Sequence, residues 1–245
     1  MNIVNDRNTK FFIRTGFFEI ATIYVVICGE TARGKNGAIH LTAWGKKQIR
    51  SSVKKNLRKI LPHLRPEIFV RAPKLYAEET ILEVAKLLTG ELNRKSIIAL
   101  DSLDPSNRPE EATTTKDLWR KARKLAELKW YESDKRIRHY HWREAGGKLA
   151  RAFKRSVEET LFDLARAIAT RPDKKTQPIG LVAGSSTFFN LVGFDQKVYQ
   201  PCQLKEIIRV EIPPLKPGDI IQYKFFIEGQ NAEQIEFVGY QYFPA

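Results

Sequence analysis

Residues 23–31 read Ile23-Tyr-Val-Val-Ile-Cys-Gly-Glu-Thr31, and this stretch decides the fold class. Its five consecutive apolar residues, rich in β-branched types, are typical of a strand that is buried on both faces in a parallel sheet. Gly29 permits a sharp turn and a close backbone approach where the strand ends. Ligand sites of open α/β sheets lie beyond the carboxyl ends of such strands, so we expect a binding site just past Ile27.

A regular alternation of helices and strands follows. Thr42 is a good N-cap for a helix over residues 43–62, in which apolar side chains recur at helical spacing. Residues 67–71 are expected to form the next strand and residues 75–89 the next helix. Residues 95–100 then predict a third strand of the buried parallel type.

The order of these motifs resembles the histidine phosphatase (phosphoglycerate mutase-like) superfamily. The motifs are the strand end in Gly-Glu-Thr31, the helix start Leu41-Thr-Ala-Trp-Gly-Lys-Lys-Gln48 and the segment Ala72-Pro-Lys-Leu-Tyr-Ala-Glu-Glu-Thr80. Leu103-Asp-Pro105 is similar to a segment of the small bacterial phosphohistidine phosphatases. The resemblance covers residues 23–105 and returns at 179–193. It implies one domain over residues 1–245, folded as a three-layer α/β/α sandwich with a mostly parallel sheet.

The catalytic residues that the resemblance implies are replaced in this chain. Family members carry Arg-His-Gly at the end of the first strand, and this histidine accepts the phosphoryl group. Here these positions hold residues 27–29, Ile-Cys-Gly, so Cys28 stands in the place of the nucleophile. The second family arginine falls on Tyr76 and the second family histidine on Gly184, and only Asp101 or Asp104 lies near the place of the general acid. Without a nucleophile and a phosphate clamp, the chain is predicted to be a pseudoenzyme.

Cys28 keeps a second hypothesis open, a phosphatase or phosphotransferase with Cys28 or Asp104 as a replacement for the catalytic histidine. Cysteine phosphatases place Cys-x5-Arg around the phosphate, whereas Arg33 here gives Cys-x4-Arg, one residue short. Glu30 would put a carboxylate inside that loop and oppose both thiolate formation and phosphate binding. We therefore interpret Cys28 as a small apolar residue that fills space at the end of the strand.

A weaker phosphate site is the other candidate in this region. Gly184-Ser-Ser-Thr187 places hydroxyls and free amides at an expected helix start, and such amides bind anions. The candidate ligand-binding residues are Arg33, Arg71, Ser185 and Ser186. The alternative is an ordinary capped helix, which we favour.

The chain is strongly basic, with 42 Lys and Arg against 28 Asp and Glu and a net charge of +14. The expected helix 43–62 carries cations without a single acid, whereas an ordinary solvated face mixes both signs. Residues 116–155 hold 14 Lys or Arg against 5 Asp or Glu, with aromatic residues between them, as nucleic-acid surfaces do. The candidate polyanion-binding residues are Lys46, Lys47, Arg50 and Lys54 in the helix and Arg120, Lys121, Arg123 and Lys124 farther along the chain. The alternative for the aromatic residues is that they pack this segment onto the body.

Two segments fall outside the motif pattern. Residues 106–145 are expected to form a basic helical insertion that ends before Gly146-Gly147, where a long amphipathic helix begins. Residues 203–245 are expected to form a β-rich C-terminal extension, whose strands 203–212, 219–228 and 234–243 make an antiparallel ribbon over one face of the sheet edge.

Composition narrows the functions further. Two cysteines and four scattered histidines have no disulfide or metal-ligand spacing, so we expect neither a metal nor a cofactor. Arg14 and Glu19 interrupt the apolar segment 11–28, so no membrane span is expected and the cytoplasm is the default location. The leading hypothesis is a pseudophosphatase whose basic surface binds a phosphorylated or polyanionic ligand or a protein partner. A nucleic-acid-binding module on this fold is a further alternative, although no named nucleic-acid module is visible.

Overall fold

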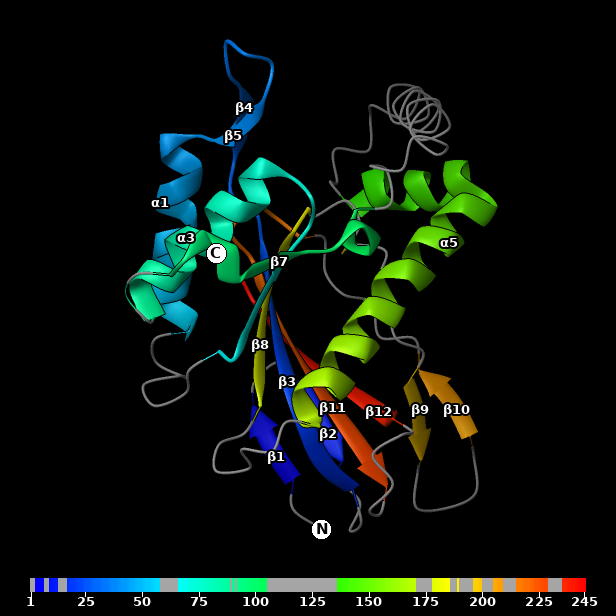
Figure 1. Ribbon diagram of the computed structural model, residues 1–245. Coiled ribbons are helices and arrows are strands. Elements are labelled where there is room, and N and C mark those ends of the chain that lie inside the picture. Colours follow the sequence, from blue (N-terminus) through cyan, green and yellow to red (C-terminus); the bar gives the residue numbers. More distant parts are fainter. Residues whose placement is uncertain are drawn as a thin grey trace.

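A six-stranded sheet with the order β12-β11-β3-β8-β6-β7 runs through the middle of the molecule (Figure 1). Its strands are β3 (Phe17–Ile27), β6 (Ile68–Arg71), β7 (Ile97–Ala99), β8 (Ile179–Gly184), β11 (Ile220–Glu228) and β12 (Ile235–Phe243). Strands β3, β8, β6 and β7 are parallel, and β11 and β12 are antiparallel to their neighbours. The computed structural model describes residues 3–6, 9–12, 17–57, 66–88, 90, 92–104, 136–170, 178–185, 189, 196–199, 205–208, 215–228 and 235–245.

Strand β3 is the centre of the core, as the opening stretch of sequence predicts. Every residue from Ala21 to Ile27 is almost completely buried. The strand begins at Phe17, six residues earlier than the predicted Ile23, because its first half pairs with the end of β11, where Glu228 lies opposite Phe17.

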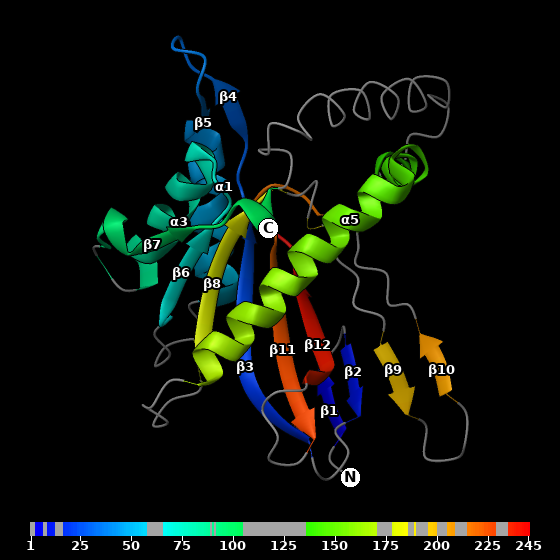
Figure 2. The same cartoon turned by 45° about the vertical axis from the view of Figure 1, so that its right-hand side comes forward.

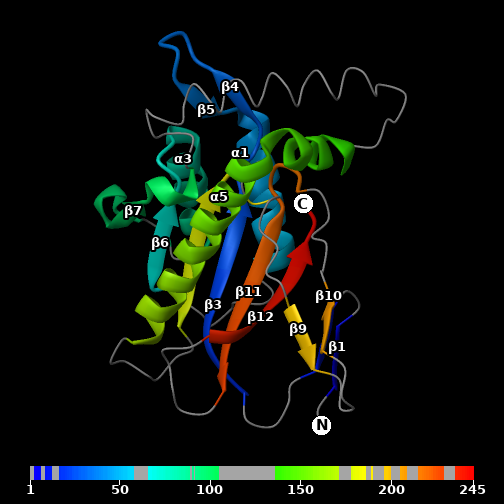
Figure 3. The same cartoon turned by 90° about the vertical axis from the view of Figure 1, so that its right-hand side faces the viewer.

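Helices cover both faces of this sheet and make three layers, as predicted (Figures 1 and 3). One face is covered by α1 (Ala43–Ser52), which continues as the π-helix η1 (Val53–Leu57), and by α3 (Leu75–Leu88). The other face is covered by α5 (Arg136–Ala169), whose Phe162 ring packs edge-on against Phe225 of β11 at 5.9 Å between centroids. Short turns η2 (Arg94–Ser96) and η3 (Asp101–Leu103) flank β7.

Three predicted elements differ from the structure. The ribbon β11–β12 lies in the plane of the sheet instead of over its edge, because Ile220–Ile227 are mostly buried and pair directly with β3. Strand β7 is an edge strand whose Ile98 is 44% exposed, because only β6 pairs with it. The expected boundary at 146–147 lies inside α5, which begins ten residues earlier.

Smaller hairpins complete the described chain. They are β1 (Ile3–Asp6) with β2 (Thr9–Phe12), β4 (Thr31–Arg33) with β5 (Ile39–Leu41), and β9 (Gln196–Tyr199) with β10 (Lys205–Ile208). Residues 105–135, most of the expected basic insertion, lie outside the described residues. Within the described chain, no helix combines the length and apolar character that a membrane crossing requires.

Candidate functional site

The carboxyl ends of β3 and β8 bring the predicted site positions together. The Cys28 amide, just after the last residue of β3, donates to the carbonyl of Gly184, the last residue of β8, over 3.0 Å. Tyr76 lies in the first turn of α3, where burial raises the pKa of its hydroxyl and Cys28 and Asp104 contribute smaller shifts in the same direction. This edge of the sheet is the place where α/β folds bind ligands.

The Cys28 thiol is held in its neutral form. The residue is 6% exposed, and its burial raises the pKa of the thiol to about 12. A hydrogen bond with Thr80 opposes this shift, and the negative charge of Asp104 adds to it. Because only the thiolate attacks phosphorus, Cys28 is in the wrong protonation state for a nucleophile at neutral pH.

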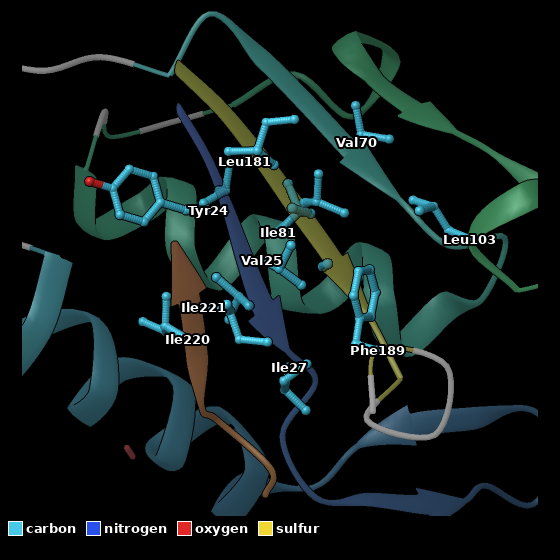
Figure 4. Packing of buried hydrophobic residues seen from close by; sticks show 14 of the residues in the cluster. Tyr24, Val25, Ile27, Val70, Ile81, Leu103, Leu181, Phe189, Ile220 and Ile221 are labelled. Carbon is cyan, nitrogen blue, oxygen red and sulfur yellow. The ribbon is translucent and has the colours of Figure 1, made fainter. Parts of the chain in front are cut away.

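Gly184, the position that the resemblance assigns to the second family histidine, is packed rather than open. A Cβ atom on Gly184 would collide with the ring of Phe189, which is itself completely buried. Figure 4 shows the Phe189 ring among the apolar side chains at this end of the sheet. A histidine at residue 184 would therefore require the ring of Phe189 to leave.

Asp104, the candidate general acid, is buried beside a lysine. The residue is 2% exposed, and its Oδ2 lies 3.6 Å from Nζ of Lys74, whose side chain is 30% exposed. The adjoining 3-10 turn η3 fixes its backbone, since the Asp104 amide donates to the carbonyl of Asp101 over 3.0 Å. This pairing holds the negative charge next to Cys28, where it disfavours a thiolate.

The residues predicted to donate hydrogen bonds to a phosphate make other contacts or lie away from the ends of β3 and β8. Arg71 donates from Nη1 to the Ala72 carbonyl over 3.2 Å and from Nη2 to Glu78 over 2.9 Å, and its buried Nε has no hydrogen-bond partner among the described residues. Arg33 is exposed on the hairpin β4–β5, which projects from the body (Figure 1). The Ser185 carbonyl accepts the amide of Phe189 over 3.3 Å, and Ser186 lies outside the described residues.

The motif residues that remain in the chain hold the loops at this edge. Gly29 and Gly45 lie backbone to backbone, since a Cβ atom on Gly29 would collide with the carbonyl of Gly45. The Thr42 hydroxyl caps α1 by accepting the Gly45 amide over 2.9 Å, and the Gln48 side chain accepts the amide of Glu30 over 3.0 Å.

Glu79 of α3, an acid of the Ala72–Thr80 motif, makes further contacts to these loops. Glu79 accepts the amide of Leu41 over 2.7 Å and lies 3.3 Å from Nδ1 of His40. The motif residues of α1 and α3 therefore fix the two strand-to-helix connections, and none of these contacts requires a substrate.

The candidate cations of α1 divide into two groups. Arg50 donates from Nε to Glu83 of α3 over 2.7 Å, and Lys86 lies 3.6 Å from the same carboxylate. Burial alone would raise the pKa of Glu83, but Arg50, Lys86 and Lys46 outweigh this effect and hold the pKa below its usual value. Arg50 is thus a structural residue that joins two helices.

The remaining described cations of α1 and η1 face solvent. Lys47 and Lys54 are exposed, and no carboxylate of the described chain lies within 4.0 Å of either. Arg120, Lys121, Arg123 and Lys124 lie outside the described residues, so their contribution to this surface stays a prediction.

Three residues that shape the site were missed from the sequence: Phe189, Lys74 and Glu83. Phe189 gives a weak signal, because it stands five residues after Gly184 in an apolar turn. Lys74 and Glu83 look like ordinary helix-surface residues, and only the tertiary fold brings them to Asp104 and Arg50. In the part of the chain that the structure describes, no three His, Cys, Asp or Glu side chains cluster as a metal site would require.

Comparison with known proteins agrees with the fold. No protein-family model and no curated protein sequence matches the chain. Among solved structures, Mycobacterial hydrolase 2 is 12% identical over 90% of this chain and 88% of its own, with a TM-score of 0.50. A phosphoglycerate mutase from Bacillus anthracis (12% identical, 70% and 77% covered, TM-score 0.44) and the protein histidine phosphatase SixA with tungstate (12%, 91% and 96%, 0.41) are more distant.

Of these three neighbours, Mycobacterial hydrolase 2 is the one whose TM-score reaches 0.50. The first of them carries the structural comparison, and at 12% identity it establishes the fold alone. The chain therefore has a phosphoglycerate mutase-like α/β fold with a mostly parallel six-stranded sheet.

Proposed function

We propose that this protein is a non-catalytic member of the histidine phosphatase-like fold, which presents a basic surface to a polyanionic ligand. The observation that carries the proposal is Cys28, a buried and protonated thiol in the place of the family nucleophile. With a pKa of about 12, roughly one thiol in 10⁵ is ionised at pH 7. Phosphoryl transfer from such a group would require the site to open first.

The surroundings of Cys28 support the same conclusion. Phe189 occupies the space beside Gly184, and Arg71 is paired with Glu78 instead of facing an anion. In contrast, the scaffold contacts of Gly45, Gln48 and Glu79 are intact. A chain that retains the contacts of the connecting loops but lacks the reactive groups fits a binding protein better than an enzyme.

The polyanion part of the proposal rests on charge. The net charge of +14 is large for a chain of 245 residues, and Lys47 and Lys54 have no carboxylate partner among the described residues. Unpaired cations on one face attract polyanions and release their counterions on binding, which gives a strong salt dependence.

The catalytic part is tested by turnover of a generic phosphomonoester, p-nitrophenyl phosphate, between pH 5 and 9. We expect hydrolysis no faster than in buffer, with no difference between the wild type, Cys28→Ala and Asp104→Asn. Hydrolysis that either substitution abolishes while the variant remains folded would overturn the proposal and favour a phosphatase with a replaced nucleophile.

The binding part is tested with heparin, a polyanion without bases, at 50 and 200 mM salt. We expect binding that weakens at the higher salt and that the double change Lys47→Glu/Lys54→Glu weakens further. Lys95→Glu, an exposed lysine beside β7, is the matched control and should bind as the wild type does. Equal binding by the double variant would remove this surface from the proposal.

A further inference from the structure

An exposed tryptophan heads a line of side chains along α1 that the site at β3 does not use. We call the residues Trp44, Lys47, Ser51 and Lys54 the Trp44 stripe. Trp44 is 53% exposed, and the other three are exposed as well. Steps of three and four residues place Trp44, Lys47 and Ser51 on one face of α1, and Lys54 follows in the first turn of η1.

The lysines of the stripe differ from the other cations of the helix. Lys46 and Arg50 face Glu83, and Lys55 donates to the Pro244 carbonyl over 3.5 Å. Lys47 instead holds its Nζ 5.3 Å from the centroid of the Trp44 ring. The helix thus directs its paired cations toward the body and leaves a ring and unpaired cations on the stripe.

The hairpin β4–β5 adds two exposed cations just before α1 in the chain. It leads directly into α1 and projects past the amino-terminal end of that helix (Figure 2). Arg33 and Lys35 on the hairpin are exposed, and neither has a carboxylate partner in the described chain. Opposing charges at the helix start are those of Glu30, whose Oε1 lies 3.4 Å from the Thr42 hydroxyl, and of Glu79, which accepts the amide of Leu41. Phosphates are therefore better accommodated toward Lys54 than at the helix start.

We infer that the Trp44 stripe binds single-stranded nucleic acid, with an unpaired base stacked on Trp44 and the flanking phosphates on Lys47 and Lys54. A solvent-exposed indole between cations is how sequence-tolerant single-strand sites are built, because every base has an aromatic face and every nucleotide a phosphate. A duplex keeps its base faces stacked inside and leaves such a ring without a partner. The inference rests on the polyanion binding proposed above and adds the base to it.

The test is binding of a fluorescein-labelled 20-residue oligothymidine by the full chain, followed by anisotropy. We expect Trp44→Ala to weaken oligothymidine binding about fivefold or more and to leave heparin binding unchanged. Trp44→Phe keeps an aromatic ring and should weaken oligothymidine binding less than Trp44→Ala does. Lys47→Glu/Lys54→Glu should weaken the binding of both oligothymidine and heparin. Phe18→Ala is the matched control, since Phe18 is an exposed aromatic residue (57%) at the far end of β3, and it should change neither.

The outcomes separate the two proposals. If heparin binds but Trp44→Ala binds oligothymidine as tightly as the wild type, the stacking inference is wrong and the polyanion proposal stands. Tighter binding of a 20-base-pair duplex than of the single strand would also overturn the inference. If neither heparin nor oligothymidine binds, both proposals fail.

Discussion

At the residue scale, the buried thiol of Cys28 is expected to make the protein less stable as the pH rises above 9. Its pKa rises from 9.0 to about 12 on folding, so the folded state holds the proton more tightly than the unfolded state. The resulting stabilisation is fully present below pH 9 and is lost as the pH rises toward 12. We predict that the free energy of unfolding falls more steeply above pH 9 in the wild type than in Cys28→Ala, as measured by urea unfolding.

Tyr24 titrates in the same range, because burial raises the pKa of its hydroxyl to about 12 against the opposing hydrogen bond with Gln222. This contribution is common to the wild type and Cys28→Ala, so the difference between them isolates the thiol. Parallel alkaline curves for the two proteins would mean that Cys28 is already accessible to solvent in the folded state.

Gly45 yields a second prediction at this scale. Alanine is the better helix former, but a Cβ atom at Gly45 would collide with the backbone of Glu30. We therefore predict that Gly45→Ala lowers the free energy of unfolding by about 1–3 kcal/mol. Ser51→Ala in the same helix is the control and should change it by less than about 0.5 kcal/mol. A stabilised Gly45→Ala would show that the two loops do not approach as described.

Residue-scale roles were only partly predictable from the sequence. The N-cap of Thr42 and the apolar role of Cys28 follow from local rules, and the structure has the cap hydrogen bond and the buried thiol. The partner of Cys28, Thr80, lies 52 residues away, and no local pattern pairs these two side chains. Burial and partner together set the pKa, which is why the sequence could not give its value.

At the element scale, Glu83 joins α3 to α1. Its side chain is 7% exposed and accepts from Arg50, which is half exposed and therefore partly screened by solvent. We predict that Glu83→Gln lowers the free energy of unfolding at pH 7 by about 1–2 kcal/mol. Because the pKa of Glu83 is lowered below 4.5 in the folded state, this stabilisation is lost as the pH falls through that folded-state pKa, so the deficit of Glu83→Gln should shrink between pH 7 and pH 3.

Two comparisons control the Glu83 experiment. Glu159→Gln, an exposed acid on α5, should leave stability unchanged at both pH values. A deficit of Glu83→Gln that persists at pH 3 would show that the substitution disturbs packing rather than an ion pair.

Asp219 ties the start of β11 to the end of β12. Its carboxylate is 1% exposed and accepts from the Lys216 amide (2.6 Å), the Tyr242 hydroxyl (2.8 Å) and the Ala245 amide (2.9 Å). We predict a loss of about 2–3 kcal/mol for Asp219→Ala, which leaves three donors unsatisfied, and about 1 kcal/mol for Tyr242→Phe, which removes one. Urea unfolding measures both, and an equal loss would show that the carboxylate acts through Tyr242 alone.

Sequence periodicity was sufficient to locate strands along the chain but not to place them in the sheet. Strands 219–228 and 234–243 were predicted within one residue of β11 and β12, but their place in the sheet was predicted wrongly. Alternation and apolar content identify a strand, whereas the choice of neighbour depends on pairing across nearly 200 residues, between β3 and β11.

At the scale of the whole molecule, the motifs predicted the three-layer fold because they consist of residues that hold loops to helices, such as Gly45, Gln48 and Glu79. They could not show what replaces the reactive groups. The contact between the Phe189 ring and Gly184 arises only in the folded chain, so no local pattern of residues predicts it. Under the function proposed above, the scaffold contacts remain in this chain while the Phe189 ring packs against Gly184, the position that the resemblance assigns to the second family histidine.

The most direct test of this account is electron density from crystals of the protein soaked in vanadate, an analogue of phosphate. If Cys28 and Phe189 fill the site as described, no ion lies next to the Cys28 sulfur and the Phe189 ring is still packed on Gly184. A vanadate bound at Cys28, with the Phe189 ring displaced from Gly184, would contradict it.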